Sequence, residues 1–178
     1  MLRLFVAIDL PEAAKTRLSL LASGLPGARW VEPKNHHVTL AFAGEVDEAV
    51  AGHLDQELAE IKGAPFPLEI AGVGSFESKG KLKSLWADVK LSEPLSILQG
   101  RVAGACARAG IVLESRKFKP HVSLARFKDQ PSKGKLGDWL MQNGLLRLEP
   151  LNVREFVLFQ SHLGGSGPHY EALVRYPL

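Results

Sequence analysis

A short pattern occurs twice in this chain, and it restricts the possible folds more than any other feature does. The first copy reads His-Val-Thr-Leu-Ala from His37, and the second reads His-Val-Ser-Leu-Ala from His121, 84 residues later. Each copy follows an apolar segment, Leu4 to Pro11 in the first half and Leu85 to Pro94 in the second, and these segments begin 81 residues apart. We infer a duplicated strand–helix–strand unit with a pseudo-two-fold axis between its two copies.

Strands and helices alternate in the predicted secondary structure. Three helices are expected, from Pro11 to Ser23, from Asp47 to Lys62 and from Ser92 to Ala109. The predicted strands cover residues 2–9, 29–32, 36–42, 66–76, 83–91, 121–127, 152–162 and 169–176, with one helical turn at 138–141. This order is typical of an α/β or α+β sheet protein. Because no long polar linker interrupts it, we expect one domain over residues 1–178.

The side-chain period of a strand assigns each residue of the repeated pattern to a face. His37 and Thr39 point to one face of their strand, and the valine and leucine of the same copy point to the other. His121 and Ser123 are placed in the same way. Two strands related by a pseudo-two-fold axis would therefore frame a cleft with two imidazoles and two hydroxyl groups.

That set of groups suits the hydrolysis of a phosphodiester without a metal ion. Two imidazoles that titrate near neutral pH can divide the work, one accepting a proton from water and the other giving one to the leaving oxygen. The hydroxyls can donate hydrogen bonds to phosphate oxygens. Arg126 would add a bidentate cation. On a regular strand Arg126 faces away from His121, so a bulge or the strand end must turn it.

Two other interpretations compete with this one. A single histidine on a half-buried strand is more often structural than catalytic, but two copies in a duplicated unit favour a functional pair. Histidine also binds metals, yet no third histidine or carboxylate joins either copy at ligand spacing, and Cys106 is the only cysteine. We therefore expect no metal and no cofactor, and we interpret Cys106 as a small buried apolar residue.

Composition and charge leave the class of ligand open. The chain has 22 Lys and Arg against 19 Asp and Glu, and the resulting charge of +3 permits an anionic ligand without requiring one. The apolar segment at the N-terminus ends at Asp9 and Pro11, well short of a signal peptide or a membrane span. We expect a monomer in the cytoplasm with no membrane partner.

Four segments resemble the two-histidine phosphoesterase superfamily, and within it the RNA 2′,3′-cyclic phosphodiesterase family, historically called 2′-5′ RNA ligase. They are Arg3 to Pro11, His37 to Val46, Phe118 to Arg126, and Phe156 to Tyr170. The resemblance covers almost the whole chain. It departs from the common pattern at Ser123, where threonine is more frequent, and at Ala43, where leucine is.

This resemblance implies an α+β fold with two lobes, in which antiparallel sheets surround a central cleft and helices pack outside. It implies hydrolysis of a terminal 2′,3′-cyclic phosphate of RNA, or of a cyclic nucleotide, to a 2′-phosphate. It assigns His37 as proton donor and His121 as proton acceptor, with Thr39, Ser123 and Arg126 binding phosphate. Ligation of 2′ and 5′ RNA ends in the same site, and a non-catalytic RNA-binding module, are the alternatives.

Other residues receive weaker interpretations. His36 is expected to be structural or exposed, His53 to lie on the surface, and His162 and His169 to flank a glycine-rich loop. Phe42, Phe76 and Trp30 are possible base-stacking residues, although core packing is the better interpretation of each. Basic residues gather in a turn and around the second histidine, where they can contact an RNA backbone: Lys79, Lys81, Lys83, Arg116, Lys117, Lys119, Lys128, Lys133 and Lys135.

Overall fold

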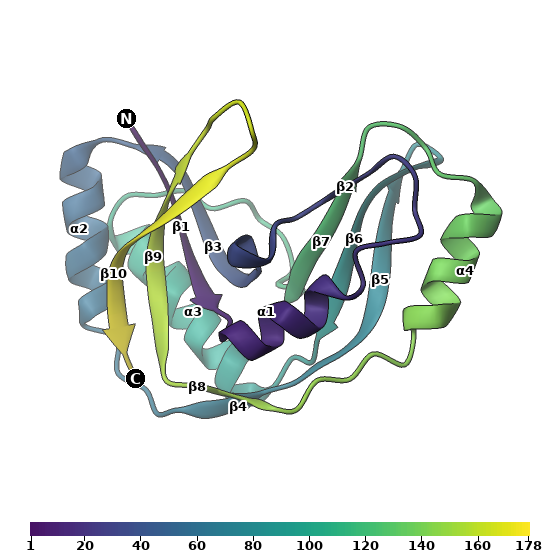
Figure 1. Cartoon of the computed structure of the whole chain (residues 1–178). Coiled ribbons are helices and arrows are strands. Elements are labelled where there is room, and N and C mark those ends of the chain that lie inside the picture. Colours follow the sequence, from purple (N-terminus) through teal and green to yellow (C-terminus); the bar gives the residue numbers. More distant parts are fainter.

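Two four-stranded antiparallel sheets form the two lobes of the protein in a computed structural model that describes all residues, 1–178 (Figure 1). Sheet A has the strand order β10-β9-β1-β3, and sheet B has the order β2-β7-β6-β5. The strands of sheet A are β1 (Leu2–Asp9), β3 (His37–Val46), β9 (Glu155–His162) and β10 (His169–Pro177). Those of sheet B are β2 (Ala28–Trp30), β5 (Ile70–Ser78), β6 (Lys81–Val89) and β7 (His121–Phe127). A third pairing joins β4 (Phe66–Leu68) to β8 (Leu151–Val153).

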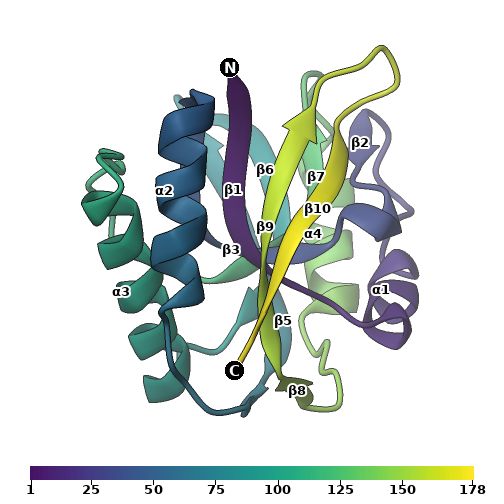
Figure 2. The same ribbon diagram turned by 90° about the vertical axis from the view of Figure 1, so that its left-hand side faces the viewer.

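Four α-helices and one 3₁₀ turn complete the fold: α1 (Glu12–Ser19), η1 (Pro33–Asn35), α2 (Glu48–Ala59), α3 (Glu93–Arg108) and α4 (Lys133–Asn143). Polar residues cap three of them. The side chains of Asp47, Ser92 and Ser132 each accept a hydrogen bond from a backbone N–H of the first turn, at 2.8, 3.3 and 3.2 Å. Helices α2 and α3 pack together and α3 contacts β3, whereas α4 contacts β5 of sheet B (Figure 2).

The α+β class, the two lobes and the outer helices agree with the prediction, but several elements differ. The segment expected to hold one helical turn forms the whole of α4, because Ser132 caps it and Trp139 anchors it in the core. Helix α1 ends at Ser19 instead of Ser23, and a turn at Leu20 and Leu21 follows it. The single strand expected at 66–76 is divided into β4 and β5, and the one expected at 152–162 into β8 and β9. The reason is that β4 and β8 pair with each other outside the main sheets.

The duplication is visible in the strand pairing. In sheet A, β1 runs antiparallel to β3 and Asp9 stands opposite His37. In sheet B, β6 runs antiparallel to β7 and Asp88 stands opposite His121. This register matches Asp9 with Asp88, 79 residues apart, so the offset of 81 inferred from the sequence is wrong by two residues. Strands β3 and β7 contact each other where the two halves meet.

Most of the core lies on one face of each sheet. A cluster of 40 buried residues includes Leu4, Val6 and Val38 from sheet A and Leu85 and Val122 from sheet B. The opposite face of each sheet carries a histidine, and we call these the histidine faces of sheets A and B. A separate cluster of four buried residues, with Phe5 and Phe159 at its centre, covers part of the histidine face of sheet A.

Strands β3 and β7 contain the same irregularity. Leu40 and Leu124, each three residues after a histidine, are left without a partner on the neighbouring strand. One extra residue in a strand reverses the alternation of side chains beyond it. The residues five positions after each histidine, Phe42 and Arg126, are consequently exposed on the histidine faces, while the preceding residue of each strand is buried.

Candidate active site

His37 is held against sheet A by one hydrogen bond and by aromatic rings. Its Nδ1 lies 2.7 Å from the backbone carbonyl oxygen of Asn35, which can only accept. Nδ1 therefore carries the proton, and Nε2 is left for chemistry. The imidazole packs on Phe5, with 4.9 Å between ring centroids, and meets the edge of Tyr170 at 5.4 Å. These contacts fix the orientation of the ring.

His121 repeats this arrangement on sheet B. Its Nδ1 lies 2.7 Å from the backbone carbonyl oxygen of Lys119, two residues earlier in the chain, just as Asn35 precedes His37. The imidazole lies beside the indole of Trp86, with 5.6 Å between ring centroids. Both halves of the molecule thus present an imidazole with a protonated Nδ1 and an unprotonated Nε2. The pair is matched in geometry as well as in sequence.

The two imidazoles differ in their exposure to water. His121 is exposed, whereas His37 is half-buried beneath its aromatic neighbours. Burial lowers the pKa of His37, because removal from water disfavours the charged imidazolium. The Asn35 carbonyl and the carboxylate of Asp9 oppose this effect. Free His37 is therefore held mainly as the neutral imidazole at neutral pH.

The two hydroxyl residues lie on the histidine faces, as the period of the strands predicts. Thr39 Oγ1 is 3.0 Å from His37 Nε2, and because Nδ1 holds the ring proton, the hydroxyl is the donor. Ser123 is half-buried and stands opposite Trp86 in the pairing of β6 with β7. Each hydroxyl is two residues from its histidine on the same face of the strand. A group bound by the histidine is therefore within reach of the hydroxyl as well.

Arg126 reaches the histidine face because of the bulge at Leu124. The sequence required such an irregularity, and β7 contains one at this position. Arg126 is exposed and acts electrostatically on Tyr170 of sheet A. Burial raises the pKa of Tyr170, and the positive charges of Arg126 and Arg3 work in the opposite direction. The charge of a residue on sheet B thus acts on an aromatic residue that packs on the histidine of sheet A.

Asp9 is a neighbour of His37 that sequence reasoning missed. It stands directly opposite His37, and its carboxylate lies 3.0 Å from the buried ammonium group of Lys15 and 3.6 Å from the guanidinium of Arg175. The recurrence of an aspartate in the second half was the available signal, since Asp88 faces His121 in the same register. Tyr170 and Trp86 were missed as well, because no local pattern connects them with a histidine.

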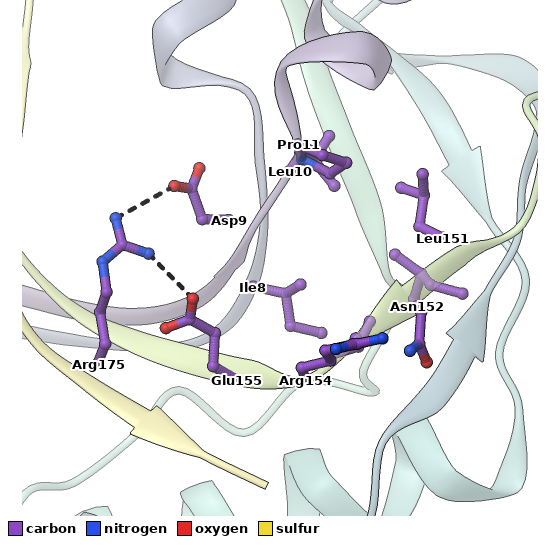
Figure 3. A pocket seen from close by; sticks show the side chains of 11 residues that line it. Ile8, Asp9, Leu10, Pro11, Leu151, Asn152, Arg154, Glu155 and Arg175 are labelled. Atoms are coloured by element: carbon purple, nitrogen blue, oxygen red, sulfur yellow. Dashed lines mark hydrogen bonds and ion pairs between the residues drawn. The ribbon is translucent and has the colours of Figure 1, made fainter.

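A cavity of about 320 Å³ opens behind Asp9, where β1 runs into α1 (Figure 3). Arg175 lies between the carboxylates of Asp9 and Glu155, at 3.6 and 3.4 Å, and Arg154 lines the same wall. Neither His37 nor His121 lines this cavity. It is therefore a neighbour of the histidine pair and not its binding site.

The remaining histidines and the cysteine do not share the matched environment of His37 and His121. His53 is exposed on α2, and exposed His162 pairs with Glu171 at 2.9 Å. His36 was expected to be either structural or exposed, and it is buried, as a structural residue would be. Cys106 is fully buried, and burial raises the pKa of its thiol to about 11, as suits a packing residue. No group of three or more potential metal ligands occurs in the chain.

The interpretation of two aromatic residues as core residues is wrong. Phe42 and Phe76 are 50% and 53% exposed, because the bulges in β3 and β5 turn their positions to the histidine faces. Trp30 is half-buried and packs near Trp139, with 6.1 Å between ring centroids, so the core interpretation holds for that residue.

None of the helices is long and apolar enough to cross a membrane.

A family model described as LigT-like phosphoesterase matches the chain twice, over residues 8–86 and 87–170, which are its two halves. An RNA 2′,3′-cyclic phosphodiesterase of Archaeoglobus fulgidus is 31% identical over 97% of this chain and 98% of the relative. The enzyme of the same description from Thermotoga maritima is also 31% identical, over 97% and 93%.

Solved structures agree with these sequence matches. The crystal structure of Escherichia coli LigT complexed with 3′-AMP is 25% identical, with a TM-score of 0.79 over 99% of this chain and 98% of the other. A crystal structure of a protein from Thermus thermophilus is 26% identical, with a TM-score of 0.80 over 99% and 97%. Escherichia coli LigT has also been solved with ATP and with phosphate.

Proposed function

The chain belongs to the LigT-like phosphoesterase family and is an RNA 2′,3′-cyclic phosphodiesterase, and we propose that His37 and His121 are its acid–base pair. The observation that supports this proposal is the matched environment of the two imidazoles. Each donates its Nδ1 proton to a backbone carbonyl two residues earlier, at 2.7 Å, which leaves Nε2 unprotonated; on His37 this nitrogen accepts a hydrogen bond from Thr39. A merely structural histidine has no need of such a counterpart in the other half of the molecule.

The proposed reaction needs two proton transfers. Water attacks phosphorus, and the bond from phosphorus to the 3′ oxygen breaks, so that the product carries a 2′-phosphate. The attacking water gives its proton to His121, and the leaving 3′ oxygen takes one from His37. Burial disfavours the proton on free His37, but the negative charge of a bound phosphodiester stabilises the imidazolium. Substrate binding therefore favours the protonated form of His37, which then acts as the acid.

Three further residues complete the proposed site. The hydroxyls of Thr39 and Ser123 donate hydrogen bonds to the non-bridging phosphate oxygens, where negative charge must be held. Arg126 adds a fixed positive charge from the bulged part of β7. Serine retains the donor that threonine supplies in the other half, so the departure at Ser123 leaves the function in place.

A turnover assay tests the function and the absence of a metal together. We expect the protein to convert a nucleoside 2′,3′-cyclic phosphate to the 2′-phosphate at the same rate with and without EDTA, because the two imidazoles supply both proton transfers. The measurement is the phosphorus NMR spectrum of the product over time. Loss of hydrolysis in EDTA that a divalent ion restores would contradict the metal-free mechanism. Binding of the nucleotide without turnover would indicate the non-catalytic RNA-binding module.

The natural partner is proposed to be RNA with a cyclic phosphate end. The structure divides the basic residues into two groups: Arg116, Lys117 and Lys119 precede His121, whereas the turn from Lys79 to Lys83 lies near Lys128, beyond Arg126. We expect oligonucleotide affinity to decrease steeply with salt, since each phosphate contact releases counterions. Fluorescence anisotropy at several salt concentrations measures this. Equal affinity for oligonucleotide and mononucleotide at every salt concentration would show that these residues are only solvated surface. The expected cytoplasmic location and monomeric state stay predictions.

A further inference from the structure

Four residues form a row across the histidine face of sheet B. Arg29 of β2 stands opposite Arg126 of β7, Arg126 stands opposite Ser84 of β6, and Ser84 stands opposite Phe76 of β5. We call these four residues the arginine row. The row lies next to the one that contains Ser123, and Arg126 connects it with the proposed site for the reacting phosphate.

The neighbouring positions fix the direction of these side chains. Trp30, Ala125 and Leu85 are directly opposite one another on the same three strands, and all three pack in the main core. Successive residues of a strand point to opposite faces. Arg29, which precedes Trp30, therefore points to the histidine face together with Arg126.

The two arginines of this row carry an uncompensated positive charge. Both are exposed, and neither forms an ion pair with a carboxylate in the structure. Like charges directly opposite on neighbouring strands destabilise a sheet. A pair of neighbouring guanidinium groups is suited to two successive phosphates of one chain, because each group can donate hydrogen bonds to an anion.

Phe76 adds an aromatic surface to the same row. Phe76 is 53% exposed and is not among the residues that pack in the main core. Neighbouring strands are about 4.8 Å apart, so Phe76 stands roughly 10 Å from Arg126 across Ser84. Proteins that bind single-stranded RNA on a sheet combine exposed aromatic rings, on which bases stack, with cations that follow the backbone.

Beyond the arginine row the sheet ends in lysines. The side chain of Gln130 accepts a hydrogen bond from the Leu82 backbone N–H at 2.8 Å and donates one to the Leu82 carbonyl at 2.9 Å. These bonds hold the turn from Lys79 to Lys83 beside Lys128. A second group of positive charges therefore lies at this end of sheet B.

We propose that the RNA chain preceding the cyclic phosphate runs along the histidine face of sheet B, with its next phosphate on Arg29, beside the Arg126 that binds the reacting phosphate, and with a base stacked on Phe76. This inference rests on the proposed function for the position of the reacting end. Arg29 and Phe76 then determine the preference for RNA over a mononucleotide, and the lysine turn receives the chain further on.

The equivalent row of sheet A lacks the same features. Phe42 occupies the position that corresponds to Arg126, and the guanidinium of Arg3 lies over its ring at 5.1 Å. Arg3 stands opposite Glu45, so its charge has a counterpart on the neighbouring strand. Sheet A therefore offers an aromatic surface without a free pair of cations, and Phe42 is a matched control for Phe76.

The test compares Arg29→Ala, Phe76→Ala and Phe42→Ala with the wild type. The probes are a short oligonucleotide that ends in a 2′-phosphate, for binding, and a nucleoside 2′,3′-cyclic phosphate, for turnover. Phe76→Ala is expected to weaken oligonucleotide binding about 5- to 150-fold, the range found for loss of one base stack. Arg29→Ala is expected to reduce the slope of log affinity against log salt by about 0.7, the value for one phosphate contact on a single strand.

Both variants are expected to hydrolyse the mononucleotide within about two-fold of the wild type, because neither contacts the reacting phosphate, and circular dichroism checks the fold. The inference is overturned if oligonucleotide binding is unchanged in both variants, or if Phe42→Ala weakens it and Phe76→Ala does not. Failure of the wild type to hydrolyse the cyclic nucleotide would overturn the proposed function instead. Binding to the 2′-phosphate oligonucleotide still tests the RNA path in that case.

Discussion

Replacement of either His37 or His121 by alanine is expected to reduce turnover of the cyclic phosphodiester by about 10²–10⁴-fold, the usual contribution of one general acid or base. The reaction needs one proton removed from water and one given to the 3′ oxygen. Each imidazole supplies one of these transfers through its Nε2. The wild type should therefore show a bell-shaped dependence of rate on pH, and each variant should lose one limb of it.

The fold should survive both substitutions. The strands are anchored on their opposite faces by Val38 and Val122, which are fully buried, and neither imidazole is part of that core. Thr39→Ala and Ser123→Ala serve as comparison variants with a smaller expected loss of turnover. They should reduce turnover less, because each removes one hydrogen bond to phosphate and leaves both proton transfers intact. Near wild-type turnover in a folded histidine variant would show that the two-histidine mechanism is wrong.

The faces of the repeated pattern could be predicted because a strand has a fixed period. Once two strands were inferred around His37 and His121, the positions of Thr39 and Ser123 followed from alternation alone. Regular alternation also predicts that Arg126 faces away from His121, unless a bulge lies between them. Both halves contain that bulge, and it also explains why Phe42 is exposed where core packing was expected.

Contacts between distant segments could not be predicted in the same way. Tyr170 packs on His37 because β10 joins sheet A through β9, and Trp86 reaches His121 through the register of β6 with β7. Pairing of distant strands depends on the whole fold and leaves no local pattern. Helix α4 was underestimated for a related reason, since its anchor Trp139 donates a hydrogen bond to the carbonyl of Leu21, 118 residues away.

His36 leads to the second large effect, a loss of stability in mild acid. Its side chain is 2% exposed and its Nδ1 has no hydrogen-bond partner. Burial lowers the pKa of His36 from 6.5 to about 4, and the positive charge of Lys15 adds to this effect. As the pH falls, the His36 imidazole therefore becomes protonated near pH 6.5 in the unfolded chain, but only near pH 4 in the folded protein. The stability contributed by neutral His36 is fully present above pH 6.5 and is lost as the pH falls through this window.

The size of this loss follows from the same two pKa values. Since one pKa unit corresponds to about 1.4 kcal/mol, the folded state should lose on the order of 3 kcal/mol between pH 7.5 and pH 4 through His36 alone. Urea denaturation of the wild type and of His36→Gln across this range isolates the effect. The difference in unfolding free energy between the two should change by that amount in favour of the variant as the pH falls. His53→Gln, altered at an exposed histidine of α2, is the matched control and should parallel the wild type. Parallel curves for His36→Gln would show that a group other than His36 controls the acid sensitivity.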